Sequence, residues 1–181
     1  MMEDLSLHIL DIAENSIVAG ATKILITINE NEQRDILTIR VTDNGRGMSG
    51  TVRKRALDPF FTTKQKRTGL GLPFLAQAAE QSGGSLSVES TPGRGTRVAA
   101  SFRHSHIDRP PFTKMAETMT VLVLSHPKID FRYLHRRNGK TFSFSGRRFL
   151  AEAGALSFMD PRIIGPLKAT MRTGLGRIGR T

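Results

Sequence analysis

An aspartate and an asparagine four residues apart are the first side chains whose spacing suits chemistry. Asp11 and Asn15 lie in HILDIAENSIVAGATKI, and a spacing of four places both on one face of a helix. An amide oxygen is a hard ligand of the kind that Mg2+ accepts, so Asn15 is a candidate metal ligand. Asp11, one turn earlier, is a candidate to orient or deprotonate an attacking nucleophile. Taken alone, however, the pair is better explained by local hydrogen bonding of Asn15.

A second carboxylate, Asp43, follows the alternating run DILTIRVT and opens the segment DNGRGM. At the end of a strand it could accept a hydrogen bond from the exocyclic amine of adenine, a group that guanine lacks at that position. Gly45 and Gly47 have no Cβ, so the backbone at these positions could approach a base closely. The alternative is an ordinary Asp-Asn-Gly turn between two elements.

The third candidate site is the segment TGLGL, which opens an expected helix. Glycines at a helix N-terminus leave backbone N–H groups free to bind phosphate. The candidate phosphate-binding residues are Thr68, Gly69, Leu70, Gly71 and Leu72. The preceding loop, residues 58–67, contains Phe60 and Lys64 and could close over a triphosphate. It could equally be a solvated basic loop.

Thr96, in GRGTRV, is the fourth candidate. It enters a strand expected beside the one that ends at Asp43, so its hydroxyl could reach the same base. The alternative is that threonine is present here for its β-propensity.

The elements that must position these residues follow from the hydrophobic pattern. Apolar residues at helical spacing predict a helix over residues 5–19, with Asp4 as its N-cap. Alternation predicts strands over 23–29 and 35–42, a helix is expected over 71–81, and a hairpin over 85–102. This order indicates an α+β sandwich in which helices cover one face of a mixed, largely antiparallel sheet.

The remaining sequence predicts a second, smaller unit. Polar residues and paired prolines mark a linker over residues 104–111, between a domain at 1–103 and a small basic α+β domain at 112–181. In the latter we expect a helix over 112–125, a hairpin over 129–149 turning at Asn138-Gly139, and helices over 150–158 and 161–172. The aromatic residues of this hairpin are expected to face a small core.

Composition restricts the class of protein. The chain has 181 residues, no cysteine and a net charge of +11, which excludes disulfides and thiolate chemistry. Residues 1–102 contribute about +1 and residues 103–181 about +10, so the basic end could meet nucleic acid, an acidic protein or solvent. No run is long enough to span a membrane, and the start is unlike a signal peptide. We therefore expect a cytoplasmic protein without a membrane partner.

The four motifs together resemble those of the GHKL ATPase superfamily. ENSIVAGATKI resembles the N box, especially that of MutL-type ATPases; DNGRGM resembles the G1 box; DPFFTTK with RTGLGL resembles the F and G2 boxes of histidine kinases. The resemblance covers residues 5–102. It implies a Bergerat fold that binds ATP and Mg2+, with Asn15 on the metal, Asp43 on adenine, and Gly69 and Gly71 at the phosphates.

The resemblance leaves the reaction open. Hydrolysing members generally have glutamate where this chain has Asp11, and His8 lies within the first helix, unlike the phosphorylated histidine of sensor kinases. The first hypothesis is a regulatory ATPase or an anti-sigma-type protein kinase that acts on a separate protein; a homodimer is also compatible. The alternative is a nucleotide-gated module whose residues 112–181 bind nucleic acid or an acidic protein with little ATP turnover. A vestigial pocket is disfavoured, because all four boxes are intact.

Overall fold

One mixed sheet forms the centre of the protein. The computed structural model describes residues 4–56, 71–154 and 161–179. The strands are β1 (Lys23–Asn31), β2 (Ile36–Asp43), β3 (Ser85–Thr91), β4 (Gly95–Arg103), β5 (Asp130–Arg137) and β6 (Lys140–Ser145). Their order in the sheet is β3-β4-β2-β1-β5-β6.

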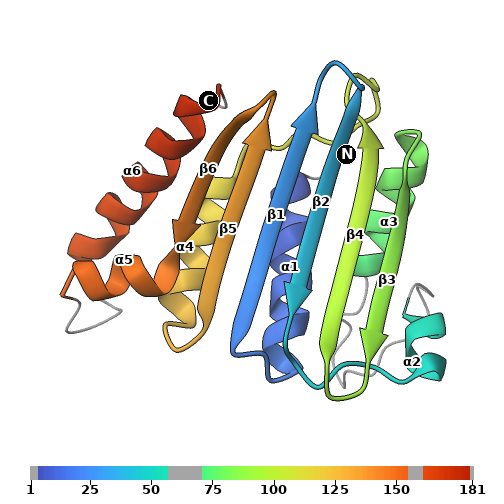
Figure 1. The fold of residues 1–181 in the computed structure, drawn as a ribbon, viewed down its shortest axis with the longest axis horizontal. Coiled ribbons are helices and arrows are strands. Elements are labelled where there is room, and N and C mark those ends of the chain that lie inside the picture. Colours follow the sequence, from blue (N-terminus) through green and yellow to red (C-terminus); the bar gives the residue numbers. More distant parts are fainter. Residues whose placement is uncertain (1–3, 57–70, 155–160, 180–181) are drawn as a thin grey trace.

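Helices lie behind this sheet and beside both of its edges (Figure 1). The helices are α1 (Leu5–Val18), α2 (Gly50–Arg55), α3 (Gly71–Gln81), α4 (Met115–Ser125), α5 (Gly146–Glu152) and α6 (Pro161–Arg177). Helices α1 and α3 share one face of the sheet, as the sequence predicted, and α4, which was expected in a separate small domain, lies on the same face (Figure 1). The α+β sandwich is therefore confirmed. None of the helices in the described part of the chain has the length and apolar character that crossing a bilayer requires.

The strands of the first half pair in the antiparallel manner expected of hairpins. β1 pairs with β2, β2 with β4, and β3 with β4. The chain then crosses behind the sheet through α4 and returns as β5, which pairs with β1 in parallel. The antiparallel edge strand β6 follows. Residues after the expected linker therefore extend the first sheet, and the two-domain division remains a prediction.

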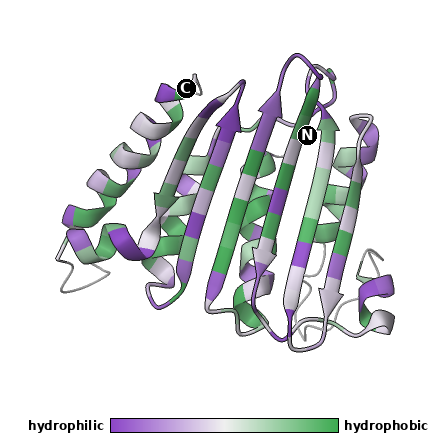
Figure 2. Cartoon of the chain, in the orientation of Figure 1, coloured by the Kyte–Doolittle hydropathy of each residue, from purple (hydrophilic) through white to green (hydrophobic). Residues whose placement is uncertain are grey.

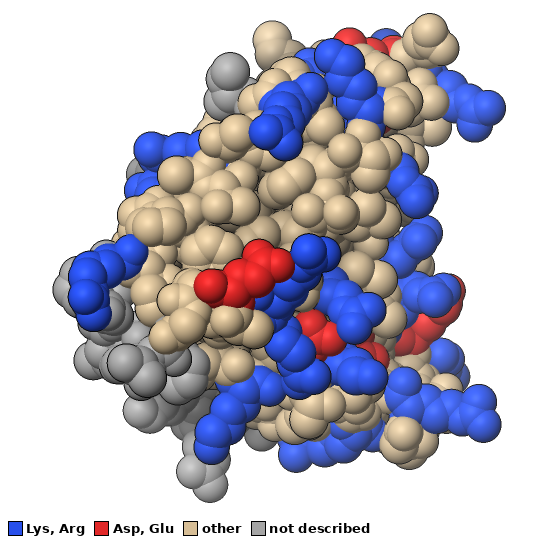
Figure 3. All heavy atoms as spheres, turned by 60° about the vertical axis from the view of Figure 1, so that its left-hand side comes forward, with Lys and Arg blue, Asp and Glu red and all other residues tan. Residues whose placement is uncertain are grey.

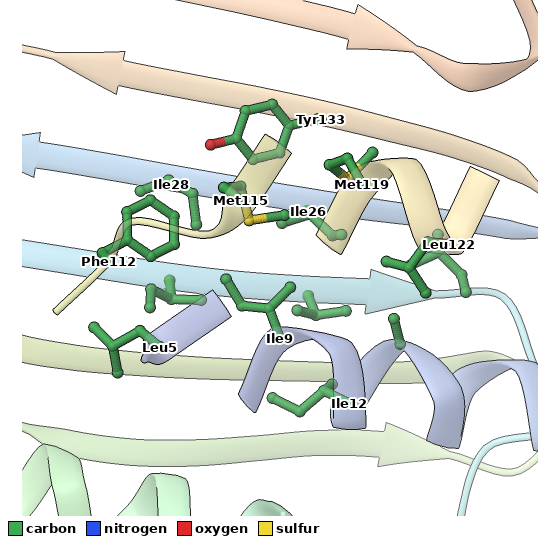
Figure 4. Packing of buried hydrophobic residues seen from close by; sticks show 14 of the residues in the cluster. Leu5, Ile9, Ile12, Ile26, Ile28, Phe112, Met115, Met119, Leu122 and Tyr133 are labelled. Atoms are coloured by element: carbon green, nitrogen blue, oxygen red, sulfur yellow. The ribbon is translucent and has the colours of Figure 1, made fainter. Parts of the chain in front are cut away.

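The core lies between the sheet and the helices. In β1, Ile24, Ile26 and Ile28 are buried while alternate residues face the other side, and Figure 2 shows this alternation along the strands. In Figure 4, the region of α4 lies over β1 and β5, α1 lies over β2 and β4, and buried side chains fill the space between them. The residues labelled there are Leu5, Ile9, Ile12, Ile26, Ile28, Phe112, Met115, Met119, Leu122 and Tyr133. This core joins elements from both halves of the chain.

Three polar residues inside this core connect the two halves. Nε2 of His135 lies 2.7 Å from Oε1 of Glu30, and the Tyr133 hydroxyl lies 2.7 Å from Nδ1 of His135. All three side chains are fully buried. Nε2 of His104 lies 3.1 Å from the other oxygen of Glu30. Buried polar groups must be paired, and here β1 and β5 supply each other's partners.

Helix α1 is held at its start by the residues that precede α4. The Asp4 carboxylate accepts hydrogen bonds from Ser6 N (2.8 Å) and from both N and Oγ1 of Thr113 (2.9 and 2.6 Å). The Leu5 N–H donates to the Pro111 carbonyl at 2.8 Å. Asp4 is thus the N-cap that the sequence predicted, and it also joins α1 to a distant segment.

Several element boundaries differ from those predicted. The expected helix over 112–125 begins at Met115. The second strand of the late hairpin ends at Ser145, whose side chain caps α5 through the Arg148 N–H, so the helix expected from residue 150 begins at Gly146. Helix α2 was not predicted; Ser49 caps it by accepting from Val52 N. The last helix extends to Arg177. As expected, Tyr133 and Phe144 of the late hairpin face the core.

Candidate nucleotide-binding site

The Asp43 carboxylate is bound from three sides at the end of β2. Its Oδ1 accepts from Gly45 N at 2.8 Å and from Thr96 N at 3.2 Å. Its Oδ2 accepts from the Ser16 hydroxyl at 2.8 Å. The side chain is half-buried. Donors from α1, β4 and the loop after β2 therefore fix its orientation before any ligand arrives.

Ser16 reaches Asp43 because it lies on the buried face of α1. The apolar residues of the buried side of α1 are Leu5, Ile9, Ile12 and Ala13, and Ser16 continues this stripe one turn later. Its Oγ lies 2.8 Å from Oδ2 of Asp43 and 3.1 Å from the Ile12 carbonyl oxygen. The single hydroxyl proton can be donated to either of these acceptors. Ser16 was not predicted as a site residue. A hydroxyl that interrupts an apolar stripe is the sequence signal that could have found it.

The loop after Asp43 is fastened to the start of β1. Oδ1 of Asn44 accepts from Thr22 N (2.9 Å) and Lys23 N (2.8 Å), and its Nδ2 donates to the Thr22 hydroxyl at 2.9 Å. The Arg46 N–H donates to the Ala19 carbonyl at 2.9 Å. The loop thus has a defined course between α1 and the β3–β4 turn.

Glycine is required where this loop passes close to other backbone. Gly47 has φ of +67°, and a Cβ there would overlap the Thr91 carbonyl. Gly95 has φ of +85°, and a Cβ there would overlap the Asp43 carbonyl. L-residues rarely adopt such φ values. A Cβ at Gly45 would lie 2.9 Å from the Ala19 carbonyl oxygen and 3.1 Å from Oδ1 of Asp43. The close approach of Gly45 and Gly47 to a base stays a prediction.

Thr96 contacts Asp43 through its backbone. Its N–H donates to Asp43, while its hydroxyl lies 2.9 Å from the Ser90 hydroxyl. Ser90 also accepts from Met48 N at 2.8 Å and donates to the Gly95 carbonyl at 3.0 Å. The predicted neighbourhood of Thr96 and Asp43 is therefore present. Ser90, which was not predicted, links β3, β4 and the Gly47 loop, and its sequence carries no signal of this role.

Asp11 lies against the first residue of α3. A Cβ at Gly71 would lie 2.8 Å from Cβ and 3.1 Å from Oδ2 of Asp11, so the carboxylate lies beside the helix N-terminus at which phosphate is expected. Asn15 follows one turn later on α1 and is half-buried. Both residues make further contacts within the protein. Helix α1 thus carries Asp11, Asn15 and Ser16 along the side that faces α3 and Asp43.

The other predicted site residues fall into two groups. Gly71 is buried, and Leu72 packs against the core. Phe60, Lys64, Thr68, Gly69 and Leu70 lie outside the described residues. The described part of the chain contains no group of three or more His, Cys, Asp or Glu that could hold a metal ion. Mg2+ that is bound together with phosphates usually takes only one or two protein ligands, and Asn15 stays the predicted one.

Comparisons with known proteins support the same relationship. Residues 3–106 match the family model described as histidine kinase-, DNA gyrase B- and HSP90-like ATPase. Sensor histidine kinase ZraS of Escherichia coli O157:H7 is 35% identical over 89 residues, which cover 49% of this chain and 19% of that protein. Sporulation kinase C of Bacillus subtilis is 34% identical over 87 residues, covering 48% and 20%. This chain thus spans about a fifth of the length of these curated relatives.

A solved structure extends the likeness of the fold beyond the matched family region. The N-terminal domain of a DNA repair protein superposes with a TM-score of 0.55 at 17% identity, covering 78% of this chain and 52% of that one. At this identity the likeness concerns the fold alone. Because the family model covers more than half of the chain, the chain belongs to the histidine kinase-, DNA gyrase B- and HSP90-like ATPase family.

Proposed function

We propose that this chain binds ATP with Mg2+ and acts as a histidine-kinase-like regulatory ATPase or protein kinase on a separate protein partner. The observation that carries the proposal is the fixed Asp43 carboxylate. Oδ1 accepts two hydrogen bonds, whereas Oδ2 accepts one from Ser16. A carboxylate oxygen can accept about two hydrogen bonds, so Oδ2 retains a position for the adenine amine.

The phosphates would lie at the N-terminus of α3. Backbone N–H groups there favour anions, and Gly71 at its first position is in contact with Asp11. The amide oxygen of Asn15 would hold Mg2+, which neutralises phosphate charge and orients the triphosphate when bound. Lys64 and the glycines at 69 and 71 are proposed to complete the phosphate site.

Asp11 is the proposed general base. As a hydroxyl of the partner, or a water, attacks the γ-phosphorus, its proton would pass to the Asp11 carboxylate while ADP leaves. Aspartate is one methylene shorter than glutamate, which favours slow or absent hydrolysis and is the feature on which the nucleotide-gated alternative rests. The matches to a sensor histidine kinase and a sporulation kinase support a role in signalling with protein partners.

The deciding experiment is incubation of the full chain with Mg2+ and γ-labelled ATP, with and without cell extract. Free phosphate and labelled protein are followed together. Transfer of label to an extract protein, lost in Asp11→Asn, would support the kinase; phosphate release alone would support the ATPase. ATP binding without either reaction would favour a nucleotide-gated module, and absence of ATP binding would overturn the proposal.

The proposed metal ligand has its own test. In Asn15→Ala, ATP binding should lose its dependence on Mg2+, measured by titration calorimetry with Mg2+ or EDTA. An unchanged Mg2+ requirement would place the metal on other residues.

A further inference from the structure

The sheet has a second face that no described helix covers. It faces the viewer in Figure 1, and the strand residues that point toward it are exposed or half-buried, apart from Asp130. Its cations are Lys23, Arg40, Arg97, Arg103, Arg132 and Arg136. A flat surface of this kind, crossed by six strands, is about 24 Å wide.

Half of these cations have no carboxylate partner in the part of the chain that the structure describes. Arg97 pairs with Glu89 at 3.4 Å, Arg103 with Asp35 at 2.9 Å and Arg132 with Asp130 at 3.0 Å. Within the described residues, Lys23, Arg40 and Arg136 have no carboxylate oxygen within 4.0 Å. The face therefore carries uncompensated positive charge.

The strand register brings the two unpaired arginines near each other. Arg40 of β2 lies opposite Thr27 of β1, and Arg136 of β5 lies opposite Asn29. Two strand spacings across and two residues along the strands place the two Cα atoms about 12 Å apart. An extended segment with acidic residues about four positions apart could reach both.

The uncharged residues of this face favour an acidic protein over a nucleic acid as its ligand. Leu25 and Ile36 are 40% and 43% exposed, and no aromatic side chain points outward from the six strands within the described residues. Surfaces that bind single-stranded nucleic acid usually stack bases on aromatic rings. Arginine beside aliphatic groups is instead typical of protein interfaces, and a second copy of the same positive face would be repelled.

We propose that this uncovered sheet face binds an acidic segment of a partner protein, with Arg40 and Arg136 as its principal contacts. Glutamate or aspartate side chains would pair with the two guanidinium groups, which can bind a carboxylate through two N–H groups. Leu25 and Ile36 lie on either side of the line that joins the two arginines, where other apolar side chains of the partner would cover them. The excess of Lys and Arg continues around the side that carries β6 and α6 (Figure 3), which would attract an acidic partner over a longer range.

The location leaves the nucleotide site accessible. Asp11, Asn15 and Ser16 lie on α1, on the opposite side of the sheet (Figure 1). A partner on the uncovered face can therefore bind with or without nucleotide, and its binding can be tested independently of the proposed function.

The test uses the full chain and a labelled poly-glutamate peptide of about ten residues, long enough to cross the sheet, with poly-glutamine as the uncharged probe. Arg40→Gln combined with Arg136→Gln should weaken poly-glutamate binding roughly tenfold. The control, Arg147→Gln with Arg177→Gln, makes the same charge change on exposed helical positions and should alter binding less than about twofold. Amide shifts on peptide addition should appear in β1, β2 and β5.

Three results would overturn the proposal. The first is absence of poly-glutamate binding. The second is an equal loss in both double variants, which would show a response to net charge alone. The third is tighter, Arg40- and Arg136-dependent binding of a DNA or RNA oligonucleotide, which would make the face a nucleic-acid surface. ATP affinity, measured in parallel, should be the same in both double variants.

Discussion

Asp43 accepts hydrogen bonds from the protein through both carboxylate oxygens. The two oxygens have different roles, one in holding the loop and one in the proposed contact with the ligand. Oδ1 fixes the loop by binding Gly45 and Thr96, while Oδ2 is directed by Ser16 toward α1. A ligand that meets Oδ2 would meet a group whose orientation is already set. Such preorganisation lowers the entropy that binding costs.

The first prediction at this scale is that Asp43→Asn removes ATP binding without unfolding the chain. The amide would keep an oxygen for the Gly45 and Thr96 N–H groups, but would present N–H donors to the adenine amine. We expect ATP affinity to fall by at least about 100-fold, because the N–H donors of the asparagine amide would face the N–H donors of adenine where a hydrogen bond is proposed. Calorimetry and thermal unfolding would measure both properties; unchanged affinity would refute the adenine contact.

The second prediction concerns Ser16, which has no proposed contact with the reacting phosphate. Ser16→Ala removes one hydrogen bond to Asp43 and should weaken ATP binding about five- to tenfold, corresponding to about 1 kcal/mol. The matched control is Ser87→Ala, at an exposed position of β3, which should leave affinity unchanged. Equal behaviour of the two variants would mean that Asp43 keeps its orientation without Ser16.

At the scale of elements, the position of α1 depends on contacts with residues far along the chain. Asp4 and Leu5 bind residues 111–113, and the Thr118 hydroxyl of α4 donates to the Ser6 carbonyl at 3.3 Å. Asp11, Asn15 and Ser16 all belong to this helix. Displacing its N-terminus would therefore move the metal ligand and the general base together.

Asp4 provides a prediction for this junction that depends on pH. Burial would raise the Asp4 pKa, but hydrogen bonds from Thr113 and Ser6 hold it below its ordinary value of 3.8. A lowered pKa in the folded state stabilises the fold above the unfolded pKa, and this stabilisation is lost as pH falls through the folded value. Asp4→Ala should cost about 1–2 kcal/mol near neutral pH, and its difference from wild type should shrink below about pH 4. Urea unfolding at several pH values would measure this.

Asp4→Asn is the control for that measurement. It can still cap α1 but accepts from Thr113 through one oxygen at most, so its loss of stability should be smaller. If the loss in free energy of unfolding caused by Asp4→Ala stayed constant from pH 7 to pH 3, the role of the charged carboxylate would be contradicted.

Helix and strand identities in the first half could be read from the sequence because burial alternates so regularly there. Ile24, Ile26 and Ile28 on β1 show period two, and Leu5, Ile9 and Ile12 on α1 show helical spacing. Strand order could not be read, since the parallel pairing of β1 with β5 depends on side chains that meet only after α4 packs. Ser90 could not be predicted because an isolated serine carries no periodicity, whereas Ser16 could have been found because its hydroxyl interrupts the apolar stripe of α1.

At the scale of the whole molecule, both halves of the chain share one sheet and one core. Phe112, Met115, Met119 and Leu122 are buried against α1 and the sheet, and burying each such side chain contributes about 1.5–3 kcal/mol. Their sum is comparable with the stability of an entire domain, about 5–15 kcal/mol. The binding site is therefore supported by residues outside the family match.

Truncation after residue 106 is the prediction that follows. The fragment should unfold at clearly lower urea concentration than the full chain, with a broad transition, because β1 becomes an edge and the inner face of α1 is uncovered. Circular dichroism with urea would measure stability, and calorimetry would measure ATP affinity. A sharp transition with the ATP affinity of the full chain would instead establish that residues 1–106, which include the predicted domain at 1–103, fold independently.

The pairing of β1 with β5 also has a consequence during synthesis. About 100 residues separate the two strands, so at about 5–20 residues per second β1 waits roughly 5–20 s with an open edge. Glu30 points inward from that edge, and any strand that docked wrongly would bury it without the 2.7 Å contact to His135; an inward-pointing charge on an open edge is a known protection against aggregation. His135 of β5 brings the partner that makes this burial acceptable. The buried carboxylate thus selects the correct final strand while the nascent chain is still incomplete.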